Sequence, residues 1–146
     1  MPLNNPAFRA GGKIYPSRFV TIDATTSYGT DFVVTQSGAS SAPIGISQDG
    51  SRLTPGVQAL TAADLYAANS GEPIQIYGLS DVCLLEVGTA ANITAGQLLA
   101  PDANGAGILA ATGKYAGAIA LESAAKSTAS QTNLVRVQVL PASKQA

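Results

Sequence analysis

Turn-forming residues recur about every eight to twelve positions in this chain, and short runs of β-branched and aliphatic residues lie between them. This spacing is typical of an all-β sandwich or barrel. The predicted strands cover residues 13–15, 18–23, 32–36, 43–47, 74–77, 82–87, 97–100, 107–111, 116–121 and 133–140. We therefore expect an all-β fold, either a small β-barrel or a β-sandwich.

Two stretches carry the clearest strand patterns. In residues 71–100, Ile74 and Ile76 alternate with polar or amphipathic neighbours, turn formers occupy 78–81, and a second apolar run follows over 82–87. This order predicts an antiparallel hairpin. In residues 133–140, three valines (135, 137 and 139) should face one side of a strand, and Arg136 and Gln138 the other.

Only one segment favours a helix. Thr61 can act as the N-cap of residues 61–68, Asp64 lies in the first turn, and alanines supply helix propensity. At two turns such a helix needs tertiary packing to form. We expect it to lie across the barrel mouth or between strands.

The length of the chain, 146 residues, favours one compact domain. Prolines and glycines dominate residues 1–12, which predicts an extended N-terminal arm, because proline fixes φ and favours extended geometry in the residue before it. We therefore expect an arm over residues 1–12, a single β domain over 13–140 and a flexible C-terminal tail over 141–146.

The composition argues against several classes of function. Charged residues make up 12% of the chain, about half the usual ~25%, and the net charge is −1, so nucleic acid and anionic membranes are unfavourable partners. The chain has no histidine and therefore lacks the commonest general base and metal ligand. No apolar run approaches the ~18 residues of a membrane-spanning helix. We expect no cofactor, no metal and no export signal.

Three short motifs have the spacing of binding sites but lack the required context. Residues 105–110 match the dinucleotide pattern G-x-G-x-x-A, but a turn precedes them and Gly113 would end a helix. Residues from Asp102 resemble the start of a calcium loop, but its twelfth position is Gly113 rather than glutamate. Asn92 begins a glycosylation pattern, which indicates only an exposed turn. A hairpin turn is the better interpretation of residues 102–107.

Candidate catalytic groups are few. A pair of carboxylates from distant strands, such as Glu86 and Glu122, could form a small hydrolase, but both lie at strand ends, where solvated polar residues are expected. Cys83, the single cysteine, lies in an apolar run and is interpreted as a small buried hydrophobe. We expect the chain not to be an enzyme.

Several β segments, in their order along the chain, resemble tailed-bacteriophage capsid decoration, or cement, proteins. The resemblance covers about residues 13–140, and its segments are Arg-Phe-Val-Thr-Ile-Asp (18–23), Ala-Pro-Ile-Gly-Ile-Ser (42–47), Gly-Glu-Pro-Ile-Gln-Ile-Tyr-Gly (71–78), Ile-Thr-Ala-Gly-Gln-Leu-Leu (93–99), Gly-Ala-Ile-Ala-Leu-Glu-Ser-Ala (117–124) and Val-Arg-Val-Gln-Val (135–139).

The resemblance implies a tulip-like β-barrel or β-sandwich on the outer surface of the virion. It would be made in the host cytoplasm, bind the major capsid protein and bridge neighbouring capsomers, commonly as a homotrimer at local threefold positions. The matched motifs identify no capsid-contacting residue. From the arm we nevertheless take five candidate contacts with the capsid or a neighbouring subunit: Leu3, Asn4, Asn5, Phe8 and Arg9.

Two other functions remain open. The first is a β-barrel binding module, such as a head fibre or an adhesin-like protein, that presents the loops over 24–29 or 37–41 to host carbohydrate or protein. The second is the small hydrolase with Glu86 and Glu122.

Overall fold

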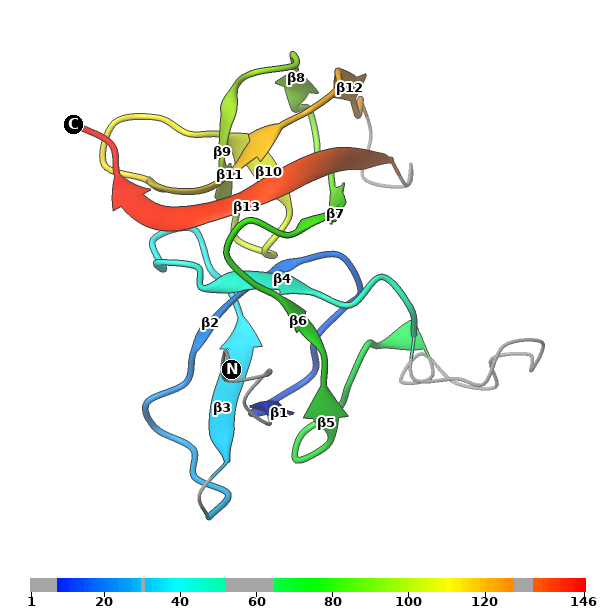
Figure 1. Cartoon of the computed structure of the whole chain (residues 1–146), viewed down its shortest axis with the longest axis vertical. Coiled ribbons are helices and arrows are strands. Elements are labelled where there is room, and N and C mark those ends of the chain that lie inside the picture. Colours follow the sequence, from blue (N-terminus) through cyan, green and yellow to red (C-terminus); the bar gives the residue numbers. More distant parts are fainter. Residues whose placement is uncertain (1–7, 30, 52–64, 128–132) are drawn as a thin grey trace.

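The computed structural model describes residues 8–29, 31–51, 65–127 and 133–146. Its thirteen strands form two lobes stacked along the long axis of the molecule (Figure 1). The first lobe contains β1 (Phe8–Ala10), β2 (Phe19–Ile22), β3 (Phe32–Gln36), β4 (Gly45–Ser47), β5 (Pro73–Ile74) and β6 (Ile76–Tyr77). The second lobe contains β7 (Val82–Glu86), β8 (Asn92–Ile93), β9 (Leu98–Pro101), β10 (Gly107–Leu109), β11 (Tyr115–Ala120), β12 (Ala124–Ala125) and β13 (Leu134–Lys144).

The first lobe is a nearly closed barrel. Its six strands are ordered β5-β1-β3-β2-β4-β6, and all pairs are antiparallel except β1 with β3. The two outermost strands, β5 and β6, are separated by Gln75 alone, so the edges of the sheet lie next to each other. Alternate side chains of the strands point inward. Together with residues of the connecting segments they form a core of mostly small residues: Ala10, Ile14, Val20, Val34, Ala67, Ala68 and Ile74.

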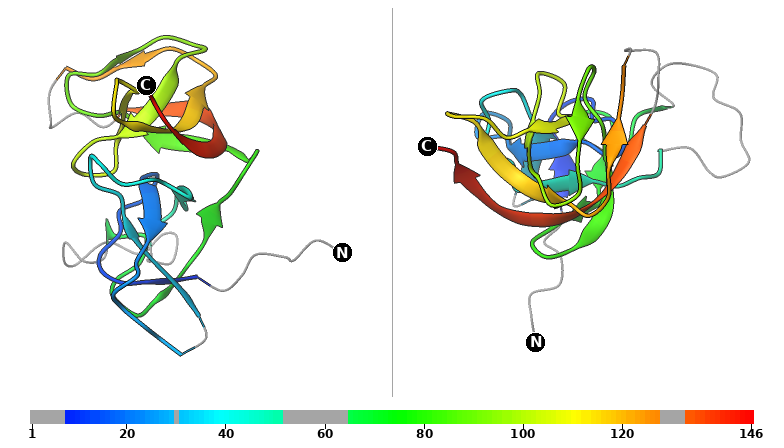
Figure 2. Two further views of the ribbon diagram at one scale, coloured as in Figure 1. Left: turned by 90° about the vertical axis from the view of Figure 1, so that its left-hand side faces the viewer. Right: turned by 90° about the horizontal axis from the view of Figure 1, so that it is seen from above.

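The second lobe is a strongly curved antiparallel sheet in the order β10-β9-β11-β13-β7, with the pair β8 and β12 beside it. A parallel bridge between Val87 and Gly107 links the two ends of this sheet. The longest strand, β13, bends across the whole lobe (Figure 2). As predicted, its three valines are buried, at 0–1% exposure, and Arg136 points outward.

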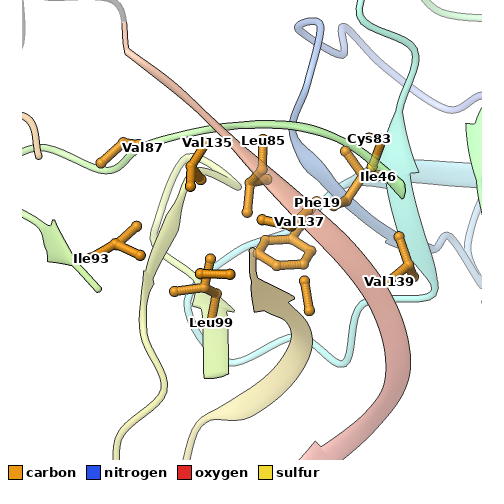
Figure 3. Packing of buried hydrophobic residues seen from close by; sticks show 12 residues of the cluster. Phe19, Ile46, Cys83, Leu85, Val87, Ile93, Leu99, Val135, Val137 and Val139 are labelled. Atoms are coloured by element: carbon orange, nitrogen blue, oxygen red, sulfur yellow. The ribbon is translucent and has the colours of Figure 1, made fainter. Parts of the chain in front are cut away.

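The two lobes share one of their cores. Phe19 and Ile46 lie opposite each other on β2 and β4, on the outer surface of the barrel, and both are fully buried. Figure 3 shows the Phe19 ring among the aliphatic side chains of the second lobe. At Gly45, next to Ile46, a Cβ atom would lie 2.3 Å from the Tyr77 carbonyl oxygen, so only glycine fits. The barrel wall is therefore also one wall of the second core.

These observations confirm the all-β, barrel-like fold, but the predicted hairpin over 74–87 is wrong. Its two strands belong to different lobes, because β6 pairs with β4 and β7 pairs with β13. The turn between them is held by β13: Ser80 N–H donates to the Val139 carbonyl, and Val139 N–H donates to the Asp81 carbonyl, each at 2.9 Å. The turn carries the chain from one lobe to the other.

The predicted helix is wrong over residues 66–68. Leu65 has 3-10 conformation, and residues 61–64 lie outside the described residues. Ile14 N–H donates to the Ala68 carbonyl at 3.0 Å, and the Ala67 N–H donates to the Ile14 carbonyl at 2.7 Å. Backbone groups that pair with a distant segment are not available for the i to i−4 bonds of a helix.

The ends of the chain also differ from the predicted boundaries. Phe8–Ala10, assigned to the arm, forms β1 inside the barrel sheet. Residues 141–144, assigned to the tail, continue β13, where Lys144 lies opposite Tyr115. The β structure therefore begins earlier and ends later than residues 13–140.

Candidate interaction surfaces

The candidate contacts in the arm fall into two groups. Leu3, Asn4 and Asn5 lie outside the described residues. Phe8 and Arg9 belong to β1 and have partners within the chain. The Phe8 ring lies 6.1 Å from the Phe32 ring, and Arg9 forms an ion pair with Asp31 and donates to the Gly71 carbonyl at 2.9 Å. Their contact with a neighbour stays a prediction.

Phe8 is part of an apolar patch at one end of the barrel, which we call the mouth patch: Phe8, Ile22 and Phe32. The register places Phe8 opposite Phe32 and Ile22 opposite Val34, so the three side chains lie on the inward face of the sheet. Phe32 is nevertheless 55% exposed and Ile22 49% exposed. Exposed aromatic and aliphatic groups that lie together often mark an interaction site.

Two carboxylates flank the mouth patch in sequence, Asp23 after Ile22 and Asp31 before Phe32. The Asp23 Oδ1 accepts the Thr25 N–H at 2.9 Å and the Thr25 hydroxyl at 2.8 Å. These hydrogen bonds lower the pKa of the Asp23 carboxyl to about 2, so it is ionised at neutral pH. The charge of Asp23 lies beside Gly11, and that of Asp31 is paired with Arg9.

A second apolar surface covers the outside of the five-stranded sheet. The outer sheet face consists of Val82, Leu84, Leu98, Ile119, Leu121, Leu134, Arg136 and Gln138. Pairing places Leu98, Ile119, Gln138 and Val82 in one row across four neighbouring strands. The opposite face of this sheet is already the second core, and a solvated outer face would normally be polar. An apolar outer face indicates a binding surface.

Arg136 lies on this outer sheet face. It is exposed, and its guanidinium forms no hydrogen bond or ion pair with any residue that the structure describes. Glu122 accepts the backbone N–H of Arg136 at 2.9 Å rather than the side chain. Because arginine is enriched in binding surfaces and pairs well with carboxylates, Arg136 can select a partner that carries one.

A hollow of about 390 Å³ lies where the two lobes meet. We call it the junction hollow; its lining residues are Tyr15, Pro16, Ser17, Arg18, Asp49, Leu65, Glu86 and Leu134. The Tyr15 ring is held edge-on against Tyr66 at 4.9 Å, and the Arg18 guanidinium carbon lies 5.6 Å from the Tyr15 ring centre. Leu65 is 55% exposed beside it. The hollow thus has apolar walls, the cation of Arg18 and the carboxylate of Asp49.

The structure corrects the expected position of Glu86. The side chain is buried, not solvated, and accepts a hydrogen bond from Lys126 Nζ at 2.8 Å; both side chains are 8% exposed. The sequence gives little signal for this pair, because the two residues are 40 positions apart. Glu122 is exposed and holds the backbone of β13. Both candidate catalytic carboxylates therefore have structural contacts.

Cys83 and the loop after β9 match their predictions. Cys83 is a free, buried cysteine in the second core, and burial raises the pKa of its thiol to about 12. Asp102 caps the turn between β9 and β10, because its Oδ1 accepts the N–H groups of Asn104 at 2.7 Å and Ala106 at 3.0 Å. The loop is a hairpin turn, in which the Asp102 carboxylate binds the backbone.

Within the described ranges, no three or more Cys, Asp or Glu side chains come together in a group that could hold a metal ion. The same residues contain no helix that is long and apolar enough to cross a membrane.

Comparison with known proteins gives a match of fold alone. No family model matches this sequence, and no curated protein matches it. The solved structures that are similar include "head fiber gp8.5 N base in bacteriophage phi29", with a TM-score of 0.56 over 96% of this chain and 96% of that chain. The two sequences are 12% identical. The chain therefore shares its two-lobed β fold with the base of a bacteriophage head fiber.

Proposed function

We propose that this chain is a structural virion protein of a tailed bacteriophage that binds the outside of the capsid and bridges neighbouring capsomers. Its partner would be the major capsid protein, and the copies would form a homo-oligomer, with a trimer favoured. The single observation that carries the proposal is the similarity to a phage head fiber base over nearly the whole of both chains. The β motifs that resemble capsid decoration proteins support the same conclusion.

The outer sheet face is the surface that we assign to the capsid. It is broad, it lies on a rigid sheet, and its aliphatic residues surround a cation without a partner among the described residues. When Arg136 is desolvated, it needs a carboxylate opposite it, so the capsid surface should be apolar with at least one acidic side chain. Each contact can be weak, since many copies on one shell act together.

Capsid shells assembled without this chain provide the test. The purified chain should cosediment with the shells and raise the temperature at which they open. Replacing Leu98 and Leu121 together by arginine should weaken binding about tenfold or more, because the added cations would be buried in the contact. The matched control is Leu79→Arg, at a residue that is 64% exposed in the turn between the lobes.

Full binding by the double variant would contradict the role of the outer sheet face. No binding by the unmodified chain would contradict the capsid function itself.

A head-fiber role is the second candidate, because the similar structure is a fiber base. The same shells distinguish the two functions. A bridging protein raises the opening temperature of the shell, whereas a fiber base that contacts a single capsomer leaves it unchanged. Binding without stabilisation would therefore favour the fiber base.

A further inference from the structure

The hairpin turn between β9 and β10 contains the dipeptide Asn104-Gly105. Asparagine is a chemically labile residue, because the backbone nitrogen of the following residue can attack its side-chain carbonyl carbon. A following glycine hinders this attack least, since it has no side chain. Asn104 is exposed, and its side-chain amide forms no hydrogen bond with any residue that the structure describes. The dipeptide is therefore a candidate modification site.

Gly105 cannot be exchanged for a residue that would hinder the attack, because the turn lies directly against the barrel. Its φ is +75°, and a Cβ atom would lie 2.9 Å from Gln36 Cγ and 3.0 Å from the Phe19 carbonyl oxygen. The Gly105 carbonyl also accepts the Phe19 N–H at 2.8 Å. The contact between the lobes thus requires the glycine that makes Asn104 reactive.

The native conformation of the turn keeps the reacting atoms apart. The Gly105 N–H donates to the Asp102 carbonyl at 3.2 Å, which closes a four-residue turn. In such turns ψ of the third residue, here Asn104, is about 0°. The Gly105 nitrogen must rotate by about 120° around the Cα–C bond of Asn104 before it eclipses the Cβ atom. Only then can a five-membered ring close between the Gly105 nitrogen and the Asn104 side chain.

Contacts with the barrel oppose this rotation. The Asn104 carbonyl must turn together with the Gly105 nitrogen, and it accepts hydrogen bonds from Arg18 Nη1 at 3.0 Å and Gln36 Nε2 at 2.7 Å. On the other side of the residue, the Asn104 N–H donates to Asp102 Oδ1 at 2.7 Å. Rotation therefore breaks the hydrogen bonds to both barrel side chains and requires local opening of the turn.

We infer that docking of this turn on the barrel protects Asn104 from deamidation, and that Asn104 is modified spontaneously when the turn leaves the barrel. The Gly105 nitrogen then loses its proton and bonds to Asn104 Cγ, the bond from Cγ to the side-chain nitrogen breaks, and ammonia leaves. Water opens the resulting succinimide to aspartate or isoaspartate.

The modification makes the opening permanent. Isoaspartate adds a methylene group to the backbone, so the turn can no longer re-form its native contacts with Arg18, Phe19 and Gln36. The reaction needs only water and does not require the capsid, so this inference is independent of the proposed function.

The test compares deamidation of the full chain in buffer and in urea above its unfolding transition, by peptide mapping with mass spectrometry. Asn104 should react at least about tenfold more slowly in the folded chain, because few molecules populate the open state. Arg18→Met and Gln36→Met each remove one hydrogen bond to the Asn104 carbonyl, so each should speed deamidation in buffer about fivefold. Lys114→Met is the matched control, since Lys114 Nζ donates to the Ala39 carbonyl, outside this turn.

The urea midpoint of each variant separates local opening from global unfolding. Equal deamidation rates in buffer and in urea would overturn the inference. It would also fail if Arg18→Met and Gln36→Met reacted no faster than Lys114→Met. Faster reaction that only matched a larger globally unfolded fraction would overturn it as well, because the whole fold rather than the docked turn would then protect Asn104.

Discussion

The two lobes of this protein build their cores in different ways. The barrel encloses a core of alanines, valines and isoleucines that comes from its own strands and connecting segments. The second lobe has a core of larger aliphatic side chains, and it takes Phe19 and Ile46 from the outside of the barrel. The barrel is thus complete in itself, whereas the second lobe is incomplete without it. This difference indicates that the second lobe cannot remain folded when the barrel unfolds.

The lobes differ in their ion pairs as well. The barrel has Arg9 and Asp31 near its surface, where water screens the attraction and the expected stabilisation is about 0–1 kcal/mol. The second lobe buries Lys126 and Glu86, for which the loss of hydration offsets much of the attraction. Removing one partner of the ion pair should therefore lower the unfolding free energy only slightly in the first lobe and strongly in the second.

Phe19→Ala tests the shared core and should have the largest effect. Phe19 is fully buried between the lobes, and deletion of a buried phenylalanine ring costs about 3–5 kcal/mol of unfolding free energy. Urea unfolding followed by circular dichroism should show one transition at lower urea. Phe8→Ala, at a half-buried ring of the mouth patch, is the control and should cost less. Two separate transitions in the unmodified chain would show that the lobes are independent.

Lys126→Met tests the buried ion pair and should have the next largest effect. The substitution leaves the Glu86 carboxylate buried without its partner, at a cost of about 3 kcal/mol. Combining Lys126→Met with Glu86→Leu removes both charges and should recover most of that stability in the same urea experiment. Arg9→Met, at the exposed pair, is the matched control in the first lobe. If the double variant were as unstable as the single one, packing rather than charge would explain the loss.

Much of the fold could be predicted from local patterns. The alternation of valines with polar residues predicted β13 and the face of the strand that is buried, because the side-chain period of a strand is a local property. Pairing is not local, and this is why the hairpin over 74–87 was wrong. The turn over 78–81 has ordinary hairpin residues, but its hydrogen bonds to Val139 and the partner strands on both sides come from distant parts of the chain.

The candidate surfaces were harder to predict. The sequence indicated that Arg136 and Gln138 point away from the valines, but it could not show that aliphatic side chains from three other strands lie around them. The junction hollow combines segments from both lobes, and no local signal joins Tyr15 with Leu65 or Leu134. Phe8 was expected to contact a neighbour, but its position against Phe32 depends on the parallel pairing of β1 and β3.

Asp23 provides the most specific test of whether the lobes unfold together, and the expected change in stability is the smallest of the three. Hydrogen bonds from Thr25 hold the pKa of the Asp23 carboxyl at about 2, below its ordinary value of 3.8, so the ionised form stabilises the folded state. This contribution is fully present above pH 3.8 and is lost as the pH falls toward 2. Asp23→Asn keeps an oxygen acceptor for the Thr25 N–H but cannot titrate, so its stability should change less between pH 5 and pH 2.

The urea midpoint of both proteins, measured across that pH range by near-ultraviolet and far-ultraviolet circular dichroism, gives the comparison. Other carboxylates titrate in both proteins, so only the difference between their pH profiles reports Asp23. Asp23 lies in a loop of the barrel, far in sequence from the second lobe, yet it should shift a single transition that includes the signal of both lobes. A shift in only part of the signal would show that the barrel loses structure while the second lobe stays folded. That result would contradict the view that the second lobe needs Phe19 of the barrel to complete its core.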